Sequence, residues 1–452
     1  MLPAELLPGW KPASKPIVGR LRTRDVAPDV NRTQSKSTDA APIACSSEWI
    51  DTSDALADVI RSLLSVDAYA IDTEFLRERT YYPRLALVQI AWRVDEGQRI
   101  VLIDPLAIDI SPLRAVFETD AVAVLHAADQ DLEVLEQSCV VAPRRIFDTQ
   151  IAAGFAGFST PSLLTLAERV LGVRLSKGDR LTDWTVRPLT SAQQSYGATD
   201  VLHLLELRDI LSSQLEEVGR LSWSDVECEL LRARSRQSTD PSRAWWRLKE
   251  GRVLRGSDRL VAQDLCAWRE LRAQQEDRPV RFVLPDLAVL AISQARPKTL
   301  EALAAVRGVD GRFTRGRTGT ELLELIKHAT TRSPDDLQLP ASEDFDKRLR
   351  PALALVSAWI AQLARDARID TQLLATRADL IAFLRNDPDA RLSVGWRNDV
   401  AGEAVRGLVA GDAALAFQPN GSLVLERRSH ERQTKELAVP QASWAETPAI
   451  DE

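Results

Sequence analysis

The chain of 452 residues contains little cysteine and no long apolar run, and each absence excludes a class of protein. Its four cysteines lie far apart, without a Cys-x-x-Cys pair or histidines at zinc-finger spacing, so we expect reduced thiols rather than disulfides or a structural zinc site. No run of about 18 apolar residues is present, which excludes a membrane-spanning helix. The first residues lack the basic-then-apolar pattern of a secretion signal, because Pro3, Pro8, Pro12 and Pro16 interrupt them. We therefore expect a cytoplasmic protein without a membrane partner.

A strong excess of one charge is also lacking. The net charge of −7 excludes a surface coated with cations, although a local basic face could still bind nucleic acid. No G-x-x-x-x-G-K-[ST] motif is present, so we expect no ATP-driven motor in this chain. Apolar residues make up 45% and charged residues 27%, as in a globular protein, and the length favours about three domains.

Local patterns divide the chain into an arm, an α/β region and a helical region. Residues 1–44 have little apolar periodicity and carry 7 Lys or Arg against 4 acids, which predicts a disordered, weakly basic arm or a plain solvated tail. Apolar runs of strand length alternate with helical patterns up to about residue 215, which predicts a mixed α/β sheet. We expect strands over 68–75, 84–92, 99–105 and 121–126, and helices over 57–65, 129–137 and 163–172.

The helical region contains a possible internal repeat. Trp268 in DLCAWRELRAQ is followed 91 residues later by Trp359 in LVSAWIAQLAR, and Asp286 is followed 93 residues later by Asp379. Two helical modules of about 80–90 residues would explain both offsets. Chance similarity between amphipathic helices is the alternative.

The string IDTEF places two acids near the end of a predicted strand. Side chains alternate across a strand, so Asp72 and Glu74 leave it on the same face and could converge on a cation. Read alone, this pair is equally typical of a solvated strand edge.

Two further strings place acids on predicted helices. Asp131 in LHAADQDLEVL lies at the start of a helix that follows a strand, where Asp129 or Asp131 could instead simply cap the helix. In QSYGATDVLHLLEL, Tyr196 and Asp200 are four residues apart and share one helix face, as an ordinary exposed pair also would.

The four carboxylates together favour a metal site. Four clustered carboxylates repel one another unless divalent cations bind between them. Oxygen ligands favour Mg²⁺ or Mn²⁺. Two such ions about 3.5–4 Å apart stabilise the attacking and leaving oxygens of an in-line displacement at phosphorus. Phosphodiester hydrolysis is the chemistry that such a site would perform.

These strings resemble a known family. IDTEF, HAADQDLEVL and YGATD are similar, in order and spacing, to the three exonuclease motifs of the DEDD superfamily, in its tyrosine-bearing branch. FDTQIAAGF (147–155) and LTDWTVRPLT (181–190) resemble strings of ribonuclease D. The resemblance covers about residues 48–212 and implies an RNase H-like fold and a 3′→5′ exonuclease.

The resemblance also implies roles for individual residues. Asp72, Glu74, Asp131 and Asp200 would bind the two metal ions. Tyr196 would orient the attacking water or help to deprotonate it. We prefer orientation, because a phenol with an ordinary pKa near 10 is a poor base at neutral pH.

Substrate contacts are expected around the acids. Phe75 could stack on the terminal nucleotide or belong to the core. Trp184 and Arg187 could line the opening of the site, although tryptophan is more often a core residue. Gln89, in LALVQIAW, is at best a weak candidate, since this run would serve equally as a buried strand.

The helical modules resemble known domains as well. Residues 258–330 resemble the helical domain at the C-termini of RecQ-type helicases and ribonuclease D. Residues 245–334 carry 17 Lys or Arg against 11 acids, and Arg307, Arg312, Arg315 and Arg317 surround glycines where they could contact phosphates or form a solvated loop. Residues 345–415, including SVGWRND (393–399), resemble the tail of some bacterial ribonuclease D proteins.

We therefore expect a metal-dependent 3′→5′ exoribonuclease that trims structured RNA, such as tRNA precursors, and releases nucleoside 5′-monophosphates as a monomer. A DNA exonuclease and a non-catalytic nucleic-acid-binding protein are the alternatives. The expected segments are an arm (1–44), an RNase H-like exonuclease domain (45–215), a helical linker (216–256), two helical domains (257–332 and 345–425) and a disordered tail (428–452).

Overall fold

The structure is a computed structural model that describes residues 46–175, 182–235, 240–314, 316–340 and 346–428. The predicted N-terminal arm, and the predicted tail beyond Arg428, lie outside the described residues. No helix in the described ranges is both long enough and apolar enough to cross a lipid bilayer.

The first part of the chain forms a six-stranded mixed sheet in the order β1-β4-β3-β2-β5-β6. The antiparallel strands β2, β3 and β4 form its centre, and β1, β5 and β6 join as parallel strands. The strands are β1 (Glu48–Ile50), β2 (Ala68–Leu76), β3 (Arg84–Val94), β4 (Gly97–Ile103), β5 (Val122–Leu125) and β6 (Arg145–Asp148). The strands β2 to β5 lie where the sequence predicts them, whereas the short β1 and β6 were not predicted.

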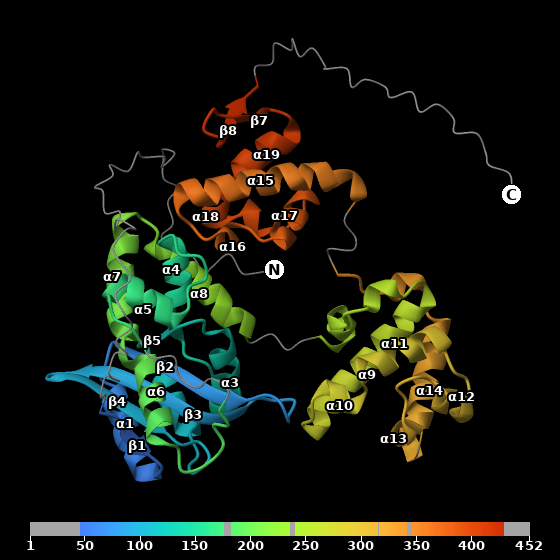
Figure 1. The fold of residues 1–452 in the computed structure, drawn as a ribbon, viewed down its shortest axis with the longest axis horizontal. Coiled ribbons are helices and arrows are strands. Elements are labelled where there is room, and N and C mark those ends of the chain that lie inside the picture. The colour runs from blue at the N-terminus through green and yellow to red at the C-terminus, as the bar shows by residue number, and fades with distance from the viewer. Residues whose placement is uncertain (1–45, 176–181, 236–239, 315, 341–345, 429–452) are drawn as a thin grey trace, which may run out of the picture. The chain divides into compact units, whose positions relative to one another are not determined.

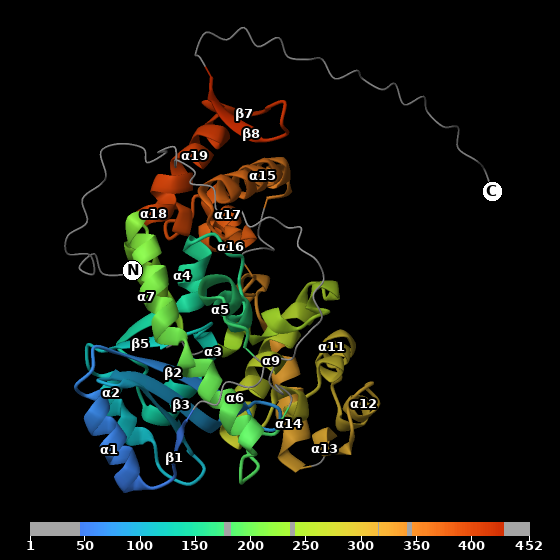
Figure 2. The same ribbon diagram turned by 60° about the vertical axis from the view of Figure 1, so that its left-hand side comes forward.

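Helices cover both faces of this sheet (Figures 1 and 2). One core contains Leu63, Phe117 and Leu132 from α1, α2 and α3, and the opposite core contains Phe155 and Val201 from α4 and α6. Strand β3 is buried without interruption from Leu85 to Trp92, as expected for an apolar strand covered on both sides. These helices are α1 (Ser53–Leu63), α2 (Arg114–Phe117), α3 (Asp129–Cys139), α4 (Thr149–Phe155), α5 (Leu163–Leu171), α6 (Ser191–Leu202) and α7 (Leu204–Glu217); a 3-10 turn, η1 (Ser111–Leu113), precedes α2.

The chain continues through α8 (Leu221–Ser235) into a helical module with its own core. Leu265, Ile292 and Leu322 are fully buried in this core. The module consists of η2 (Pro241–Arg247), η3 (Gly251–Val253), α9 (Ser257–Glu276), α10 (Val280–Val283), α11 (Asp286–Ala295), α12 (Leu300–Ala304), α13 (Gly311–Thr314), α14 (Gly316–Thr331) and η4 (Pro334–Asp336).

A second module repeats the start of the first. Its helices α16 and α17 begin 91 residues after α10 and α11, and the long helices α9 and α15 both end before a residue in the left-handed conformation, Asp277 or Arg368. The module ends in a hairpin of two strands, which the sequence analysis did not predict. Its elements are η5 (Lys347–Leu349), α15 (Arg350–Ala367), α16 (Thr371–Leu374), α17 (Arg377–Leu384), η6 (Arg391–Ser393), α18 (Gly395–Arg397), the π-helix η7 (Asn398–Gly402), α19 (Glu403–Ala410), β7 (Ala413–Phe417) and β8 (Leu423–Arg427).

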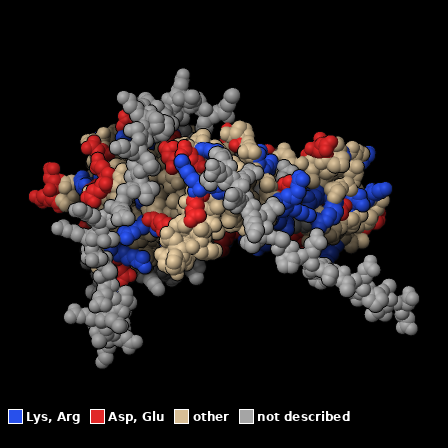
Figure 3. All heavy atoms as spheres, turned by 90° about the horizontal axis from the view of Figure 1, so that it is seen from above, with Lys and Arg blue, Asp and Glu red and all other residues tan. Residues whose placement is uncertain are grey.

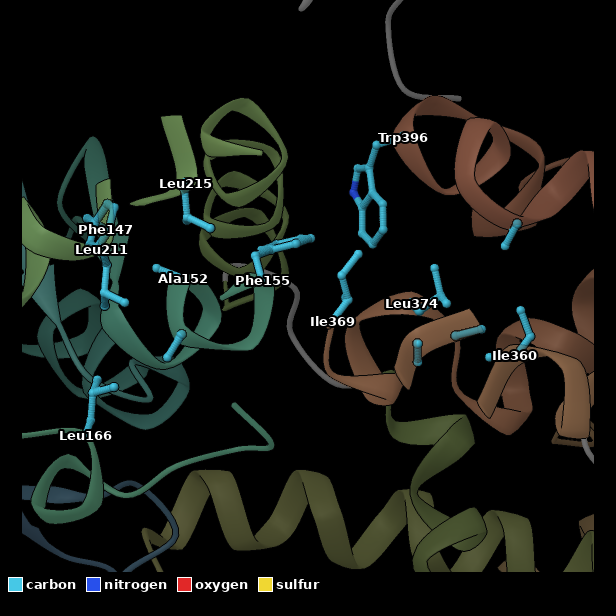
Figure 4. Packing of buried hydrophobic residues seen from close by; sticks show 14 of the residues in the cluster. Phe147, Ala152, Phe155, Leu166, Leu211, Leu215, Ile360, Ile369, Leu374 and Trp396 are labelled. Atoms are coloured by element: carbon cyan, nitrogen blue, oxygen red, sulfur yellow. The ribbon is translucent and has the colours of Figure 1, made fainter. Parts of the chain in front are cut away.

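The second module shares a hydrophobic core with the α/β region. Figure 4 shows Phe155 of α4 directed towards Trp396 and Ile369. The Phe155 and Trp396 rings meet edge to face at 5.1 Å, and Trp223 of α8 stacks on Trp396 at 5.2 Å. Because Leu215, Ile360 and Leu374 belong to the same cluster, this module packs as part of the body that contains α4 and α7.

Candidate active site

Two acids of the candidate site lie on β2, at the centre of the sheet. Asp72 and Glu74 point to the same face, and a bulge follows between Glu74 and Phe75. The carboxylate oxygens of Asp72, Glu74 and Asp200 all lie within 4.8 Å of one another, and all three residues are half-buried. The strand and the helix therefore bring three of the four predicted acids into one group.

Helix α6 carries Asp200 and Tyr196 over the sheet. Its N-terminus is held by a capping box between Thr190 and Gln193. Gly197 allows the close approach, because a Cβ there would lie only 3.1 Å from Leu87 Cδ2 and 3.3 Å from Gln89 Nε2. One residue before this glycine, the Tyr196 ring lies 5.9 Å from that of Trp184.

The fourth acid, Asp131, enters from α3 on the other side of β2. It is 8% exposed, and its carboxylate accepts a hydrogen bond from Thr73 Oγ1, between the two acids of β2. The N-cap position of α3 is Ala128, without a side-chain cap, so the structure contradicts the alternative that Asp131 or Asp129 caps this helix.

The turn before α3 is held by a residue that the sequence analysis did not single out. Asp148, 1% exposed, accepts hydrogen bonds from the backbone N–H groups of Ala127 (3.1 Å) and Ala128 (2.9 Å). Ala127 has a left-handed backbone, with φ of 59°. In the sequence, the only signal for Asp148 is its position as the second residue of FDTQIAAGF.

The electrostatics of the acids favour a bound cation. Burial raises the pKa of Asp72 well above its ordinary value, and the charges of Asp131, Asp200 and Glu74 raise it further. Burial likewise raises the pKa of Asp131 to about 6, although the hydrogen bond from Thr73 opposes the shift. Divalent cations would relieve the repulsion, and a donor set of carboxylate oxygens alone fits Mg²⁺ or Mn²⁺.

The predicted substrate residues near the acids make mainly structural contacts. Trp184 is 5% exposed and lies in a small core with Leu87 and Leu189. Arg187 binds both Asp104 carboxylate oxygens, at 2.7 and 2.8 Å, and the carbonyl oxygens of Trp184, Val186 and Ala86. These contacts hold the segment before α6, so Trp184 supports Tyr196 from a core position rather than from an exposed opening.

The position of Phe75 agrees in part with each of its two predicted roles, a core residue and a stacking partner of the terminal nucleotide. Its ring is half-buried and packs against the core on the α3 side of the sheet. The Arg77 guanidinium lies 5.3 Å from the ring centroid. Stacking of Phe75 on a nucleotide stays a prediction.

The predicted basic cluster of the first helical module is described only in part. Arg315 and the side chain of Arg312 lie outside the described residues. Arg317 of α14 is 91% exposed and forms an ion pair with Glu321, and Arg307 is exposed. Figure 3 shows acidic and basic side chains interspersed over one face, with a group of Lys and Arg on its right-hand part.

The chain matches family models in both regions. A model described as "3'-5' exonuclease" matches residues 47–216, and the HRDC domain model matches residues 258–326. The HRDC match falls on the first helical module. The relation of the second module to this domain stays a prediction.

Whole proteins are similar as well. Ribonuclease D of Gluconacetobacter diazotrophicus is 36% identical over 377 residues, which are 81% of this chain and 93% of that protein. Ribonuclease D of Escherichia coli K12 is 33% identical over 375 residues, or 80% and 98%. The crystal structure of Escherichia coli RNase D, described as an exoribonuclease involved in structured RNA processing, aligns with a TM-score of 0.71 at 31% identity, over 81% of this chain and 99% of that one.

These matches confirm the resemblance and the fold class that the motifs predicted. The mixed sheet carries the exonuclease match, and the helical region carries the HRDC match. The chain belongs to the ribonuclease D family of 3′→5′ exoribonucleases.

Proposed function

We propose that Asp72, Glu74, Asp131 and Asp200 bind two divalent cations, Mg²⁺ or Mn²⁺, and that the enzyme uses them to remove nucleotides from RNA 3′ ends. The observation that carries this proposal is the convergence of three carboxylates within 4.8 Å. The fourth, Asp131, is close enough for its charge to raise the pKa of Asp72. Two cations held there would stabilise the attacking and leaving oxygens at phosphorus.

The side chains of this chain place the other reactants. Tyr196 projects from the same helix as Asp200, so its phenol oxygen is suited to hydrogen-bond the attacking water. The water oxygen bonds to the last phosphorus as the bond to the preceding 3′-oxygen breaks, and that oxygen takes up a proton. A nucleoside 5′-monophosphate leaves, and a new 3′-hydroxyl end remains. Trp184 acts as a positioning residue, because its ring packs beside Tyr196.

The substrate that we propose is structured RNA such as a tRNA precursor. The Escherichia coli relative is described as acting in structured RNA processing. The exposed Arg307 and Arg317, with Arg312 and Arg315 from the same stretch of sequence, would contact phosphates of the RNA body. Phe75 would stack on the terminal nucleotide, and Arg187 would support the opening of the site through Asp104. We also propose that the enzyme works in the cytoplasm, as a monomer and without ATP.

Digestion of a 3′-labelled tRNA precursor, with and without a chelator, tests this function. The expected product is labelled nucleoside 5′-monophosphate, released only with Mg²⁺ or Mn²⁺. A matched DNA oligonucleotide in parallel tests the choice of substrate, since faster release from DNA would contradict it. Absence of mononucleotide with either metal would instead favour a non-catalytic binding protein.

A further inference from the structure

A buried glutamine lies directly beside the acids. Gln89 of β3 is the antiparallel register partner of Asp72, and residues in such a pair project from the same face with Cβ atoms about 4.5–5.5 Å apart. Gln89 is 0% exposed. Its neighbours on this face of β3, Leu87 and Ala91, are apolar and fully buried. The amide is therefore a single polar group in an otherwise apolar row, next to a candidate metal ligand.

The amide has no hydrogen-bond partner within the described part of the chain. Neither Nε2 nor Oε1 of Gln89 meets a partner among the residues that the structure describes, although both atoms are buried. Buried polar groups in proteins are nearly always hydrogen-bonded, and an unpaired one is destabilising. A leucine or methionine would fill the same volume without this cost. The position therefore favours a polar group for a reason other than packing.

Helix α6 leaves room for this amide. Gly197 lies over Gln89, and a Cβ at residue 197 would come within 3.3 Å of Nε2 and 3.4 Å of Cγ. Asp200 follows three residues later on the same helix and belongs to the carboxylate group with Asp72. The same glycine thus accommodates the Gln89 amide and brings Asp200 to the acids.

We propose that Gln89 is a positioning residue for the acid cluster: its Nε2–H group donates a hydrogen bond to the Asp72 carboxylate and orients that ligand when cations are bound. Asp72 is the acceptor because it lies directly across the strand pair on the same face. An amide suits this place better than a charged donor, since it orients a carboxylate without neutralising it. This inference rests on the proposed metal site. Outer hydrogen bonds of this kind typically contribute 10- to 100-fold to metal affinity or activity.

The test uses the full-length protein with Gln89→Leu and Gln89→Met, which keep the volume and remove the amide. Calorimetric titration of the metal-free protein with Mn²⁺ measures cation binding independently of activity. Melting temperature without metal reports on folding, and kcat and KM on a labelled RNA report on turnover. Gln98→Leu is the matched control. Gln98 of β4 is the register partner of Arg93, so it lies on the same face of the sheet as Gln89, and its Nε2 is also buried without a partner in the described residues. Gln98 lies away from the acids, since Arg93 is four residues beyond Gln89 on β3.

The expected result is weaker Mn²⁺ binding in both Gln89 variants, by about 10-fold or more, with a similar fall in kcat and an unchanged KM for RNA. Their metal-free melting temperatures should equal or exceed that of the wild type, and Gln98→Leu should bind Mn²⁺ as the wild type does. Wild-type Mn²⁺ affinity in the Gln89 variants would overturn the inference and leave the proposed function intact. A wild-type protein that binds no Mn²⁺ would overturn both. Loss of folding in both variants would show that Gln89 acts through packing, which also overturns the inference.

Discussion

The Arg397 guanidinium binds the Glu227 carboxylate through both of its terminal nitrogens, and the two side chains are 4% and 5% exposed. Glu227 also accepts hydrogen bonds from Trp396 Nε1 at 3.1 Å and from Arg391 at 2.9 Å. Glu227 lies on α8, whereas its three partners belong to the second helical module. This ion cluster joins the module to the segment that follows the exonuclease sheet.

Glu227→Ala should therefore destabilise the protein strongly. The substitution leaves the buried Arg397 without its partner, which typically costs about 3–5 kcal/mol. Urea unfolding at neutral pH measures the loss. Glu229→Ala is the matched control on the same helix, since the Glu229 side chain is 49% exposed where it pairs with Arg232, and its loss should stay below about 1 kcal/mol. Equal losses in the two variants would contradict the structural role of the cluster.

Asp131→Asn should reduce turnover by at least about 100-fold, because loss of an outer hydrogen bond alone can cost that much at a metal site. The amide still accepts the hydrogen bond from Thr73, so folding and RNA binding should be retained. Single-turnover digestion and a filter-binding measurement separate the two effects. Asp129→Asn, an exposed change two residues earlier, should retain wild-type activity. Undiminished hydrolysis by Asp131→Asn with Mg²⁺ present would remove this residue from the site.

Asp72 and Asp131 should stabilise the metal-free protein less as the pH rises. The folded-state pKa of Asp131 is raised to about 6, and that of Asp72 is also raised, so the folded protein binds more protons than the unfolded chain above about pH 4. The contribution of these two acids to the free energy of unfolding should therefore fall as the pH rises from about 4 through 6. Cations bind the deprotonated carboxylates, so the gain in melting temperature with Mg²⁺ should be larger at about pH 8 than at about pH 5.5. Equal gains at both values would argue against a site built on these two acids.

Asp104 should show the opposite dependence on pH. Burial alone would raise the pKa of Asp104, but the hydrogen bonds from Arg187 and from the backbone outweigh it and lower the pKa. Its stabilising contribution is thus complete above the ordinary value near 4 and is lost as the pH falls through the folded-state value. Asp104→Asn should cost about 2 kcal/mol at neutral pH and flatten the acid side of the stability profile.

RNA affinity provides a second measurement on the same Asp104→Asn variant. We expect the variant to keep the KM of the wild type. The wild-type Arg187 guanidinium already binds Asp104 and backbone carbonyls, so the substitution removes no contact between Arg187 and RNA. Tighter RNA binding in this variant would show that a released Arg187 contacts the substrate directly.

Elements that depend on local geometry could be predicted from the sequence alone. Alternation along a strand put Asp72 and Glu74 on one face, and a four-residue spacing put Tyr196 and Asp200 on one side of a helix. The apolar runs predicted β2 to β5, because several consecutive residues share one pattern there. The three- and four-residue strands β1 and β6 are too short for such a pattern. The hairpin of β7 and β8 is rich in alanine and leucine, which suit a helix equally well.

The partners of these residues follow from the tertiary structure. Asp131 does not cap its helix but accepts a hydrogen bond from Thr73. Trp184 lies in a core, and Glu227 binds Arg397, which is 170 residues away in the sequence. The tertiary structure explains a further contact. It also places Gln89, which the sequence offered only as a weak candidate, against Gly197 and next to Asp72. Backbone geometry decides which side of a helix or strand a residue occupies. Contacts between distant segments depend on how the completed elements pack, which no local pattern contains.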